Sequence, residues 1–364
     1  EDPKQAKGIV KREVVRIVTP GTNLDTQALD ETKNNYIMCI VYIADRYGVS
    51  IADISTGDYF VTELPDGSRL MDEIYKFSPS EIICNEAFLV SGYDVEDLKS
   101  RLHMSVSSLE SHMFDDDGCR RILMRHFKVN TLIGLGVEEF PTGILAAGAL
   151  LQYLYDTHKT DLEHFTHISP YLTSKYMLLD SSTRRNLELT ETLREKQKRG
   201  SLLWVLDKTK TAMGGRLLRN YIEQPLIDKE EMEKRLDAIQ ELNQDSISRD
   251  EIREYLNPVY DLERLLSKVT YKTANPRDLI AFRNSLQMLP PIKTVLSGFQ
   301  KEELAAIREE IDGLEDIYQL IDEAIVEEPP ISIREGGMIK DQFDETIDHL
   351  RAAKHDGKQW LVQL

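Results

Sequence analysis

The sequence predicts an α/β unit with a mixed sheet, followed by an all-α helical unit. Three observations lead to this expectation. Runs rich in β-branched and aromatic residues alternate with short turns over residues 36–63. Strand-like and helix-like patterns then alternate as far as residue 158. From residue 183 onward the apolar residues follow helical spacing, and we find no convincing strand pattern.

The α/β unit is expected to begin with three adjacent antiparallel strands, because the turns between them are short. Strands are predicted at 36–44, 49–55, 59–63, 81–84 and 104–109, and helices at 69–77, 115–127 and 141–158. Pro141 takes the favoured first position of the last of these helices. Upstream, residues 1–33 are polar and predict a linker from a missing domain, with one strand-like run at Val14–Val18.

The helical unit carries start and stop signals at its expected boundaries. Capping residues and apolar spacing predict helices at 228–242 and 262–269, and another between Asn275-Pro276 and Pro290-Pro291. A last helix is expected from about Asp341, and it reaches Leu364 without a Gly, Asn or Pro to end it. We therefore expect a piece of a longer protein, cut within a helix.

Composition excludes several classes of protein. The 364 residues are 41% hydrophobic, enough for two or three packed domains, and the net charge of −18 excludes a general polyanion binder. The cysteines Cys39, Cys84 and Cys119 are far apart, as expected of buried thiols in a reducing compartment, and we predict a cytoplasmic location. No apolar run approaches the ~20 residues needed to cross a bilayer, so no membrane association is expected.

The chain shows no motif for nucleotide or metal chemistry. A GxxxxGK[ST] phosphate loop is absent from the sequence, and the pairs Gly214-Gly215 and Gly336-Gly337 predict backbone turns. His164 and His167 are three residues apart in a polar connector, where we expect solvated side chains and no metal site.

The carboxylates of the α/β unit permit one enzymatic alternative. Three antiparallel strands followed by mixed helices and strands resemble the ribonuclease H architecture, whose nucleases gather acids around two metal ions. Here the candidate acids are Asp45, Asp53, Asp58 and the triplet 115–117. The first predicted strand holds no acid, two of the candidates fall in turns, and the triplet precedes a helix, so structural roles are favoured over a divergent nuclease.

A basic strip over residues 194–219 provides a second alternative. It carries eight Lys or Arg against two acids, and Lys196, Lys198 and Arg199 are its candidate phosphate contacts. The strip predicts either weak autonomous DNA binding or a solvated surface paired with the acidic segment 301–328. The second interpretation is favoured.

The segment Ser182-Thr183-Arg184-Arg185-Asn186-Leu187-Glu188-Leu189 resembles the signature that opens the core domain of the bacterial MutS family of DNA mismatch-recognition proteins. Further resemblances follow in family order: Pro20-Gly21-Thr22, Asp53-Ile54-Ser55-Thr56-Gly57, Gly134-Leu135-Gly136-Val137-Glu138, Met213-Gly214-Gly215-Arg216-Leu217-Leu218, Pro225-Leu226, Asp261-Leu262-Glu263-Arg264, Asn275-Pro276-Arg277-Asp278-Leu279 and Glu335-Gly336-Gly337-Met338-Ile339-Lys340. Gln342 departs from the family, which more often has Gly there.

The resemblance implies a domain map. Residues 1–33 would be a linker from the missing mismatch-reading domain, 34–160 a ribonuclease H-like connector domain, 165–340 the first half of a helical core domain, and 341–364 the start of a lever helix toward the missing clamp.

The resemblance also implies partners. The parent protein is expected to be a homodimer that binds mismatched duplex DNA, with ATP and Mg²⁺ in an ATPase domain outside this chain. The fragment itself is expected to hold no catalytic residue, cofactor or metal, and to couple mismatch binding to the ATP state and to MutL recruitment. MutL is expected to contact a connector helix through Arg120, Arg121 and Arg125.

Overall fold

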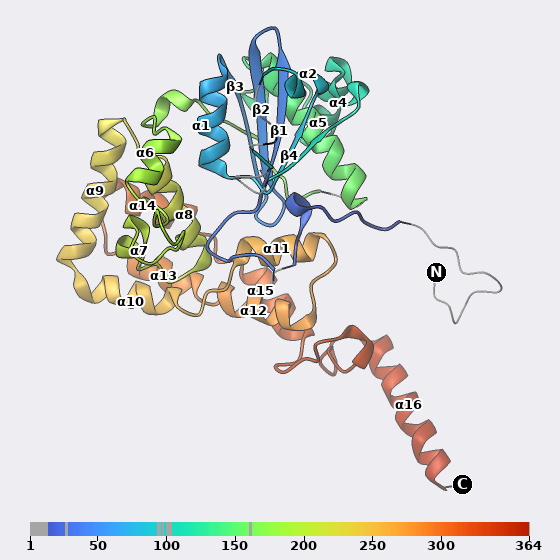
Figure 1. The fold of residues 1–364 in the computed structure, drawn as a ribbon. Coiled ribbons are helices and arrows are strands. Elements are labelled where there is room, and N and C mark those ends of the chain that lie inside the picture. The colour runs from blue at the N-terminus through green and yellow to red at the C-terminus, as the bar shows by residue number, and fades with distance from the viewer. Residues whose placement is uncertain are drawn as a thin grey trace. The chain divides into compact units, whose positions relative to one another are not determined.

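The computed structural model describes residues 14–363 apart from 26–27, 93–95, 97, 100–103 and 160–161, and at 174 and 355–363 it describes the backbone alone. The chain forms two compact units. The first is Glu1–Asp228 together with Leu266–Tyr271, and the second is Lys229–Leu265 together with Lys272–Leu364. In Figure 1 the first three strands of the sheet in the first unit are blue, and the helices of the second unit run from yellow to red.

The first unit is built on one mixed sheet. Its strands are β1 (Tyr36–Ile43), β2 (Arg46–Asp53), β3 (Asp58–Leu64), β4 (Glu81–Cys84), β5 (Ser105–Ser108) and β6 (Ser169–Pro170), in the order β5-β4-β1-β2-β3-β6. The pairs β1–β2 and β2–β3 are antiparallel, while β4, β5 and β6 each pair parallel to a neighbour. The predicted mixed sheet is therefore confirmed, and the two-residue β6 is an addition too short to leave a sequence pattern.

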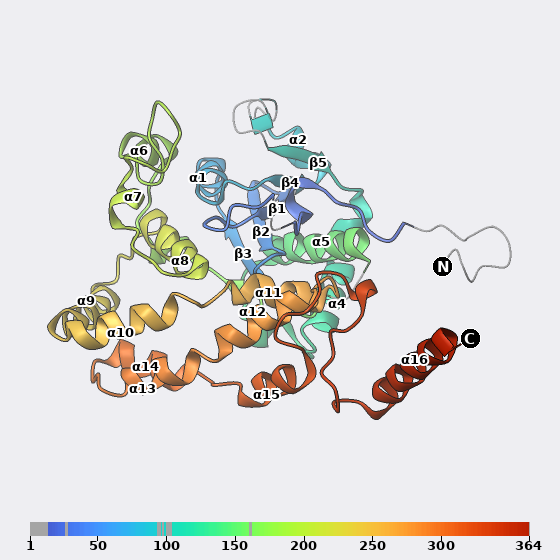
Figure 2. The same ribbon diagram turned by 90° about the horizontal axis from the view of Figure 1, so that it is seen from below.

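Helices cover both faces of the sheet. They are α1 (Gly67–Phe77), α2 (Glu86–Leu89), α4 (Asp116–His126) and α5 (Pro141–His158), and α1 lies on the opposite side of the sheet from α4 and α5 (Figures 1 and 2). The side chains of β1 alternate accordingly, because successive residues of a strand point to opposite faces. Ile37 and Cys39 pack with α4 and α5, whereas Met38 and Ile40 pack with α1.

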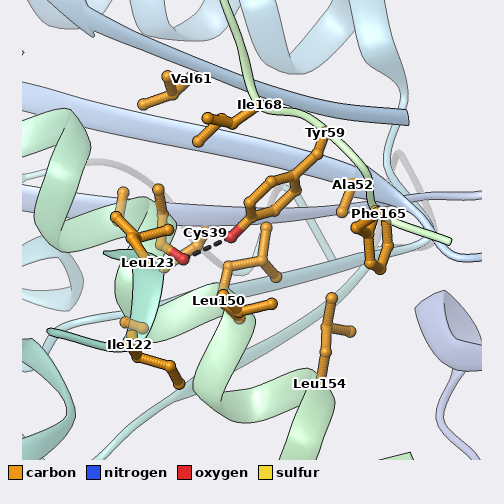
Figure 3. Close-up of a cluster of buried hydrophobic side chains, with 14 of the residues drawn as sticks. Cys39, Ala52, Tyr59, Val61, Ile122, Leu123, Leu150, Leu154, Phe165 and Ile168 are labelled. Carbon is orange, nitrogen blue, oxygen red and sulfur yellow. Dashed lines mark hydrogen bonds between the residues drawn. The ribbon is translucent and has the colours of Figure 1, made fainter. Parts of the chain in front are cut away.

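The core beneath α5 is close-packed around Tyr59. Its ring lies among Leu150, Leu154 and Phe165, and its hydroxyl donates a hydrogen bond to the backbone oxygen of Ala147 at 2.5 Å (Figure 3). Two glycines allow α5 to approach its neighbours. A Cβ at Gly148 would lie 2.3 Å from Cys119 Cβ on α4, and a Cβ at Gly48 would lie 2.0 Å from the Thr142 carbonyl oxygen. The close approach of α5 to α4 and to β2 therefore requires glycine at these two positions.

The remaining helices confirm an all-α second half. In the first unit they are α6 (Ser181–Asn186), α7 (Leu202–Leu206) and α8 (Ala212–Glu223). The later ones are α9 (Lys229–Gln244), α10 (Ser246–Leu256), α11 (Leu262–Thr270), α12 (Pro276–Leu286), α13 (Leu289–Leu296), α14 (Glu302–Glu310), α15 (Glu315–Ala324) and α16 (Glu345–Gln363). No described helix is both long and apolar enough to cross a membrane.

The structure corrects one predicted strand and one predicted helix boundary, and other predictions fall outside the residues that it describes. Val14–Val18 is not a strand, and Ile17 instead donates a single backbone hydrogen bond to Thr157 at the end of α5. The prolines 290–291 occupy the first turn of α13, where their missing N–H groups cost nothing, and α12 has already ended at Leu286. Residues 1–13 and 364, and the side chains of the last turns of α16, lie outside the described residues.

Candidate functional site

The predicted MutL-contact residues all lie on α4. Asp115 caps this helix by accepting a hydrogen bond from the Gly118 backbone N–H at 2.8 Å. Arg120 is held by two ion pairs, at 3.0 Å to Asp116 and 3.0 Å to Glu138.

Arg121 and Arg125 differ from Arg120 in their exposure. The Arg121 side chain is 69% exposed and lies 3.9 Å from Asp115, and Arg125 is exposed as well. These two arginines are four residues apart and therefore share one face of the helix. The structure thus separates a structural Arg120 from an outward-facing pair, which we call the α4 arginine pair.

The basic strip does not form one uniform surface. Lys196 and Arg199 are exposed in the loop between α6 and α7, but Lys198 is half-buried and its Nζ lies 2.5 Å from the Asp207 carboxylate. Arg216 is buried, and its Nη1 donates to the Glu31 carbonyl oxygen at 2.9 Å. Several cations of the strip therefore stabilise the first unit, and two of the three candidate phosphate contacts remain open to solvent.

The acidic segment expected to neutralise the strip finds partners within its own unit. Lys234 binds Glu302 at 2.6 Å, and Arg283 binds both Asp322 and Glu327 at 2.8 Å. Pairing between this segment and the strip would join the two compact units, and it stays a prediction.

Two of the candidate nuclease acids, Asp53 and Asp45, make hydrogen bonds that hold the local fold. Asp53 is fully buried at the end of β2, where its carboxylate accepts hydrogen bonds from Asn34 Nδ2 at 2.9 Å, Asn35 N at 2.9 Å and Ser55 N at 2.8 Å. Asp45 lies in the β1–β2 turn and accepts from the Tyr42 hydroxyl at 2.6 Å. Among the residues that the structure describes, no three His, Cys, Asp or Glu side chains gather as a metal site would require.

The end of α11 enters the core of the sheet unit, a contact that no sequence pattern predicted. Tyr271, which follows α11, belongs to the hydrophobic cluster beneath α5. Its ring stacks on His158 with centroids 5.1 Å apart, and its hydroxyl lies 3.2 Å from His164 Nε2. One turn earlier, Ser267 donates to the Ser55 carbonyl oxygen at 2.9 Å. We call Ser267 and Tyr271 the α11 anchor.

Burial lowers the pKa of the two histidines that contact the anchor. Desolvation lowers the pKa of His158 to about 4 and that of His164 to about 4, so both are neutral near pH 7. The expectation that His164 is solvated is therefore wrong: its ring packs against Phe165 and Tyr271. His167 is exposed, as expected. The three cysteines are buried free thiols, also as expected.

Comparison with protein families identifies both halves of the chain. The family model described as MutS domain II matches residues 35–168, and the model described as MutS domain III matches residues 182–361. The chain belongs to the MutS family. The resemblance noted in the sequence is thereby confirmed, together with the succession of connector and core domains.

Curated MutS relatives match along the whole chain. It is 60% identical to the DNA mismatch repair protein MutS of Lachnoclostridium phytofermentans, and 47% and 46% identical to the proteins of that name from Ruminiclostridium cellulolyticum and Acetivibrio thermocellus. The alignments cover all of this chain but 39%, 42% and 42% of those proteins. The chain therefore spans about two fifths of the length of these relatives.

The MutS domain matches and the compact units divide the chain differently. Residues matched by MutS domain III occur in both units, since the first unit continues to Asp228 and also takes in Leu266–Tyr271. The α11 anchor is therefore a point where side chains of MutS domain III are built into the core of MutS domain II.

Proposed function

We propose that this chain is the connector and core segment through which a longer MutS protein couples mismatch binding to its ATP state and to MutL recruitment. The segment itself performs no catalysis. ATP and Mg²⁺ are bound by a part of the parent outside this chain. The parent acts as a cytoplasmic homodimer on mismatched duplex DNA, and the division into linker, connector, core and lever helix follows the residue ranges given above.

The observation that carries this proposal is the division of α11 between the two compact units. Leu262–Leu265 belongs to the second unit and Leu266–Tyr271 to the first. A helix is a stiff element, and coupling between distant sites needs stiff elements with discrete arrangements. Because Tyr271 is packed in the core and Ser267 is hydrogen-bonded to Ser55 in the turn after β2, the helix cannot turn or slide without breaking contacts inside the sheet unit.

MutL recruitment is assigned to the α4 arginine pair. Arg121 and Arg125 extend from a helix that is packed closely against α5 at Gly148, so the helix presents two exposed cations on one face. Such a surface suits an acidic partner patch, and charge complementarity there raises the rate of association. Arg120 contributes less to recognition, because its guanidinium is already occupied by Asp116 and Glu138.

The test is a pull-down of MutL by the full-length protein on mismatched DNA with ATP. Arg121→Glu with Arg125→Glu should weaken MutL capture by about tenfold, while mismatch affinity stays within about twofold. Arg69→Glu, on α1 at the opposite face of the sheet, serves as a charge-reversal control away from α4 and should leave capture unchanged. Equal capture by the double variant and the unsubstituted protein would place the MutL contact elsewhere.

A further inference from the structure

A cavity of about 700 Å³ lies within the first compact unit and has no role in the coupling described above. Its wall comes from the chain leading into β1, the end of α1, helix α6 with the loop that follows it, and the last turns of α8. All four stretches belong to Glu1–Asp228, so the cavity is internal to one unit. A volume of this size lies within the range of roughly 300–1,000 Å³ seen for small-molecule sites.

The charge of the cavity wall is opposite to that of the protein. Two acids, Glu191 and Glu223, face six cations: Lys33, Lys76, Arg184, Arg185, Lys196 and Arg219. The whole chain has a net charge of −18, so this concentration of positive charge is local. Cations gathered in a concave wall focus the field and raise the local concentration of anions.

Some of these cations are already paired and others are open to a ligand. Lys76 is buried and its Nζ lies 3.0 Å from Glu73, and Arg219 lies 3.3 Å from Glu223. Arg185 and Lys196 are exposed at the rim.

Arg219 also has an unsatisfied donor. Among the described residues its buried Nε has no hydrogen-bond partner. A buried donor without an acceptor costs about 1–3 kcal/mol, and an anion that accepted from it would remove this cost.

Aromatic and amide side chains complete the wall. Tyr75 is half-buried at the end of α1, beside Phe77, which packs edge-on against Tyr36 with centroids 5.2 Å apart. Asn34 and Asn220 provide neutral donors and acceptors on the same wall. A planar base stacked on a tyrosine ring gains about 1–3 kcal/mol, which gives the cavity a second means of recognition besides charge.

We propose that this cavity binds a small phosphate-bearing ligand of the nucleotide class. Arg185, Lys196 and Arg219 receive the phosphates, and Tyr75 receives the base. Arginine forks match phosphate oxygens in pairs, which favours phosphate over a simple halide. The cations converge on one cavity instead of following a line, so the geometry fits a compact oligophosphate better than the extended backbone of a duplex.

The 364-residue chain itself is suited to the test, because its sequence contains no GxxxxGK[ST] loop that would bind nucleotide elsewhere. Calorimetric titration at low salt, without magnesium, compares ATP, tripolyphosphate and adenosine. ATP is expected to bind most tightly, tripolyphosphate more weakly, and adenosine at least about tenfold more weakly than ATP. Raising the salt concentration should weaken the binding of ATP.

Two matched double variants locate the site. Arg185→Glu with Lys196→Glu should reduce ATP affinity by at least about tenfold, whereas Arg194→Glu with Lys210→Glu, also one arginine and one lysine, both exposed and outside the cavity wall, should change it by less than about twofold. All four side chains are exposed, so unchanged circular dichroism and melting temperature should accompany both variants. Equal loss in the two variants, tighter binding of a short duplex than of ATP, or tripolyphosphate binding as tightly as ATP would each overturn the proposal.

Discussion

The α11 anchor makes a quantitative prediction about the stability of the sheet unit. Replacing Tyr271 by Ala removes a ring that is 7% exposed, its stack on His158, and its hydroxyl contact with His164. Truncation of a buried aromatic side chain costs about 3–5 kcal/mol. Tyr271→Phe keeps the ring and removes the hydroxyl, so it should cost about 0.5–1.5 kcal/mol.

Amide hydrogen exchange of the central strands measures this effect locally, which matters because a chain with two compact units need not unfold in one step. The exchange free energy of β1, β2 and β3 should fall by about 3–5 kcal/mol in the Tyr271→Ala variant. The control is Tyr260→Ala, since the Tyr260 side chain is 55% exposed and its loss should change stability by less than about 0.5 kcal/mol. A loss below about 1 kcal/mol in the Tyr271→Ala variant would show that the anchor is not part of the sheet core.

Three further outcomes are expected of the first unit. Because burial holds the folded-state pKa of His158 and His164 at about 4, below the ordinary 6.5, the unfolded state takes up protons first as the pH falls. The free energy of unfolding should therefore fall as the pH drops from 6.5 to 4, which urea titrations at stepped pH would measure. The loss should reach up to about 3 kcal/mol for His158 and less for the partly exposed His164. His158→Gln with His164→Gln should make the free energy of unfolding depend less steeply on pH. An unchanged dependence would contradict its assignment to these two histidines. Gly148→Ala forces a Cβ against Cys119 and should cost about 1–3 kcal/mol in thermal melts, whereas Gly134→Ala, with open space around it, should be near neutral. Lys76→Met removes the cation that neutralises the buried Glu73 carboxylate and should cost about 3–5 kcal/mol, much of it recovered by adding Glu73→Gln; no recovery would mean that the ion pair is not the cause.

Local signals in the sequence were sufficient for most of the individual elements. Pro141 and the apolar run after it correspond to α5, and the run at 81–84 corresponds to β4. The acids 115–117 mark the start of α4, where Asp115 caps the helix. Each of these features depends on neighbours a few residues away, which is the range over which propensity and capping act.

Contacts between distant residues could not be predicted in the same way. Nothing near Tyr271 indicates that its ring lies against His158, and the polar sequence around His164 suggested solvent where the structure has a packed ring. The candidate site shows the same limit. Arg120, Arg121 and Arg125 look alike in sequence, and they differ because Glu138, eighteen positions from Arg120, binds one of them. The cavity wall likewise combines residues from four separate stretches of chain.

The most direct test of the central claim measures coupling in the full-length protein with the anchor loosened but the ring retained. Ser267→Ala with Tyr271→Phe removes the hydrogen bonds of the anchor to Ser55 and His164 without opening a large cavity. The quantity measured is the ratio of mismatch affinities without and with ATP, which expresses the coupling free energy between the two sites. We expect this ratio to fall by at least about threefold in the double variant while mismatch affinity without ATP stays within about twofold. An unchanged ratio, with the fold intact, would contradict the proposal that α11 transmits the signal.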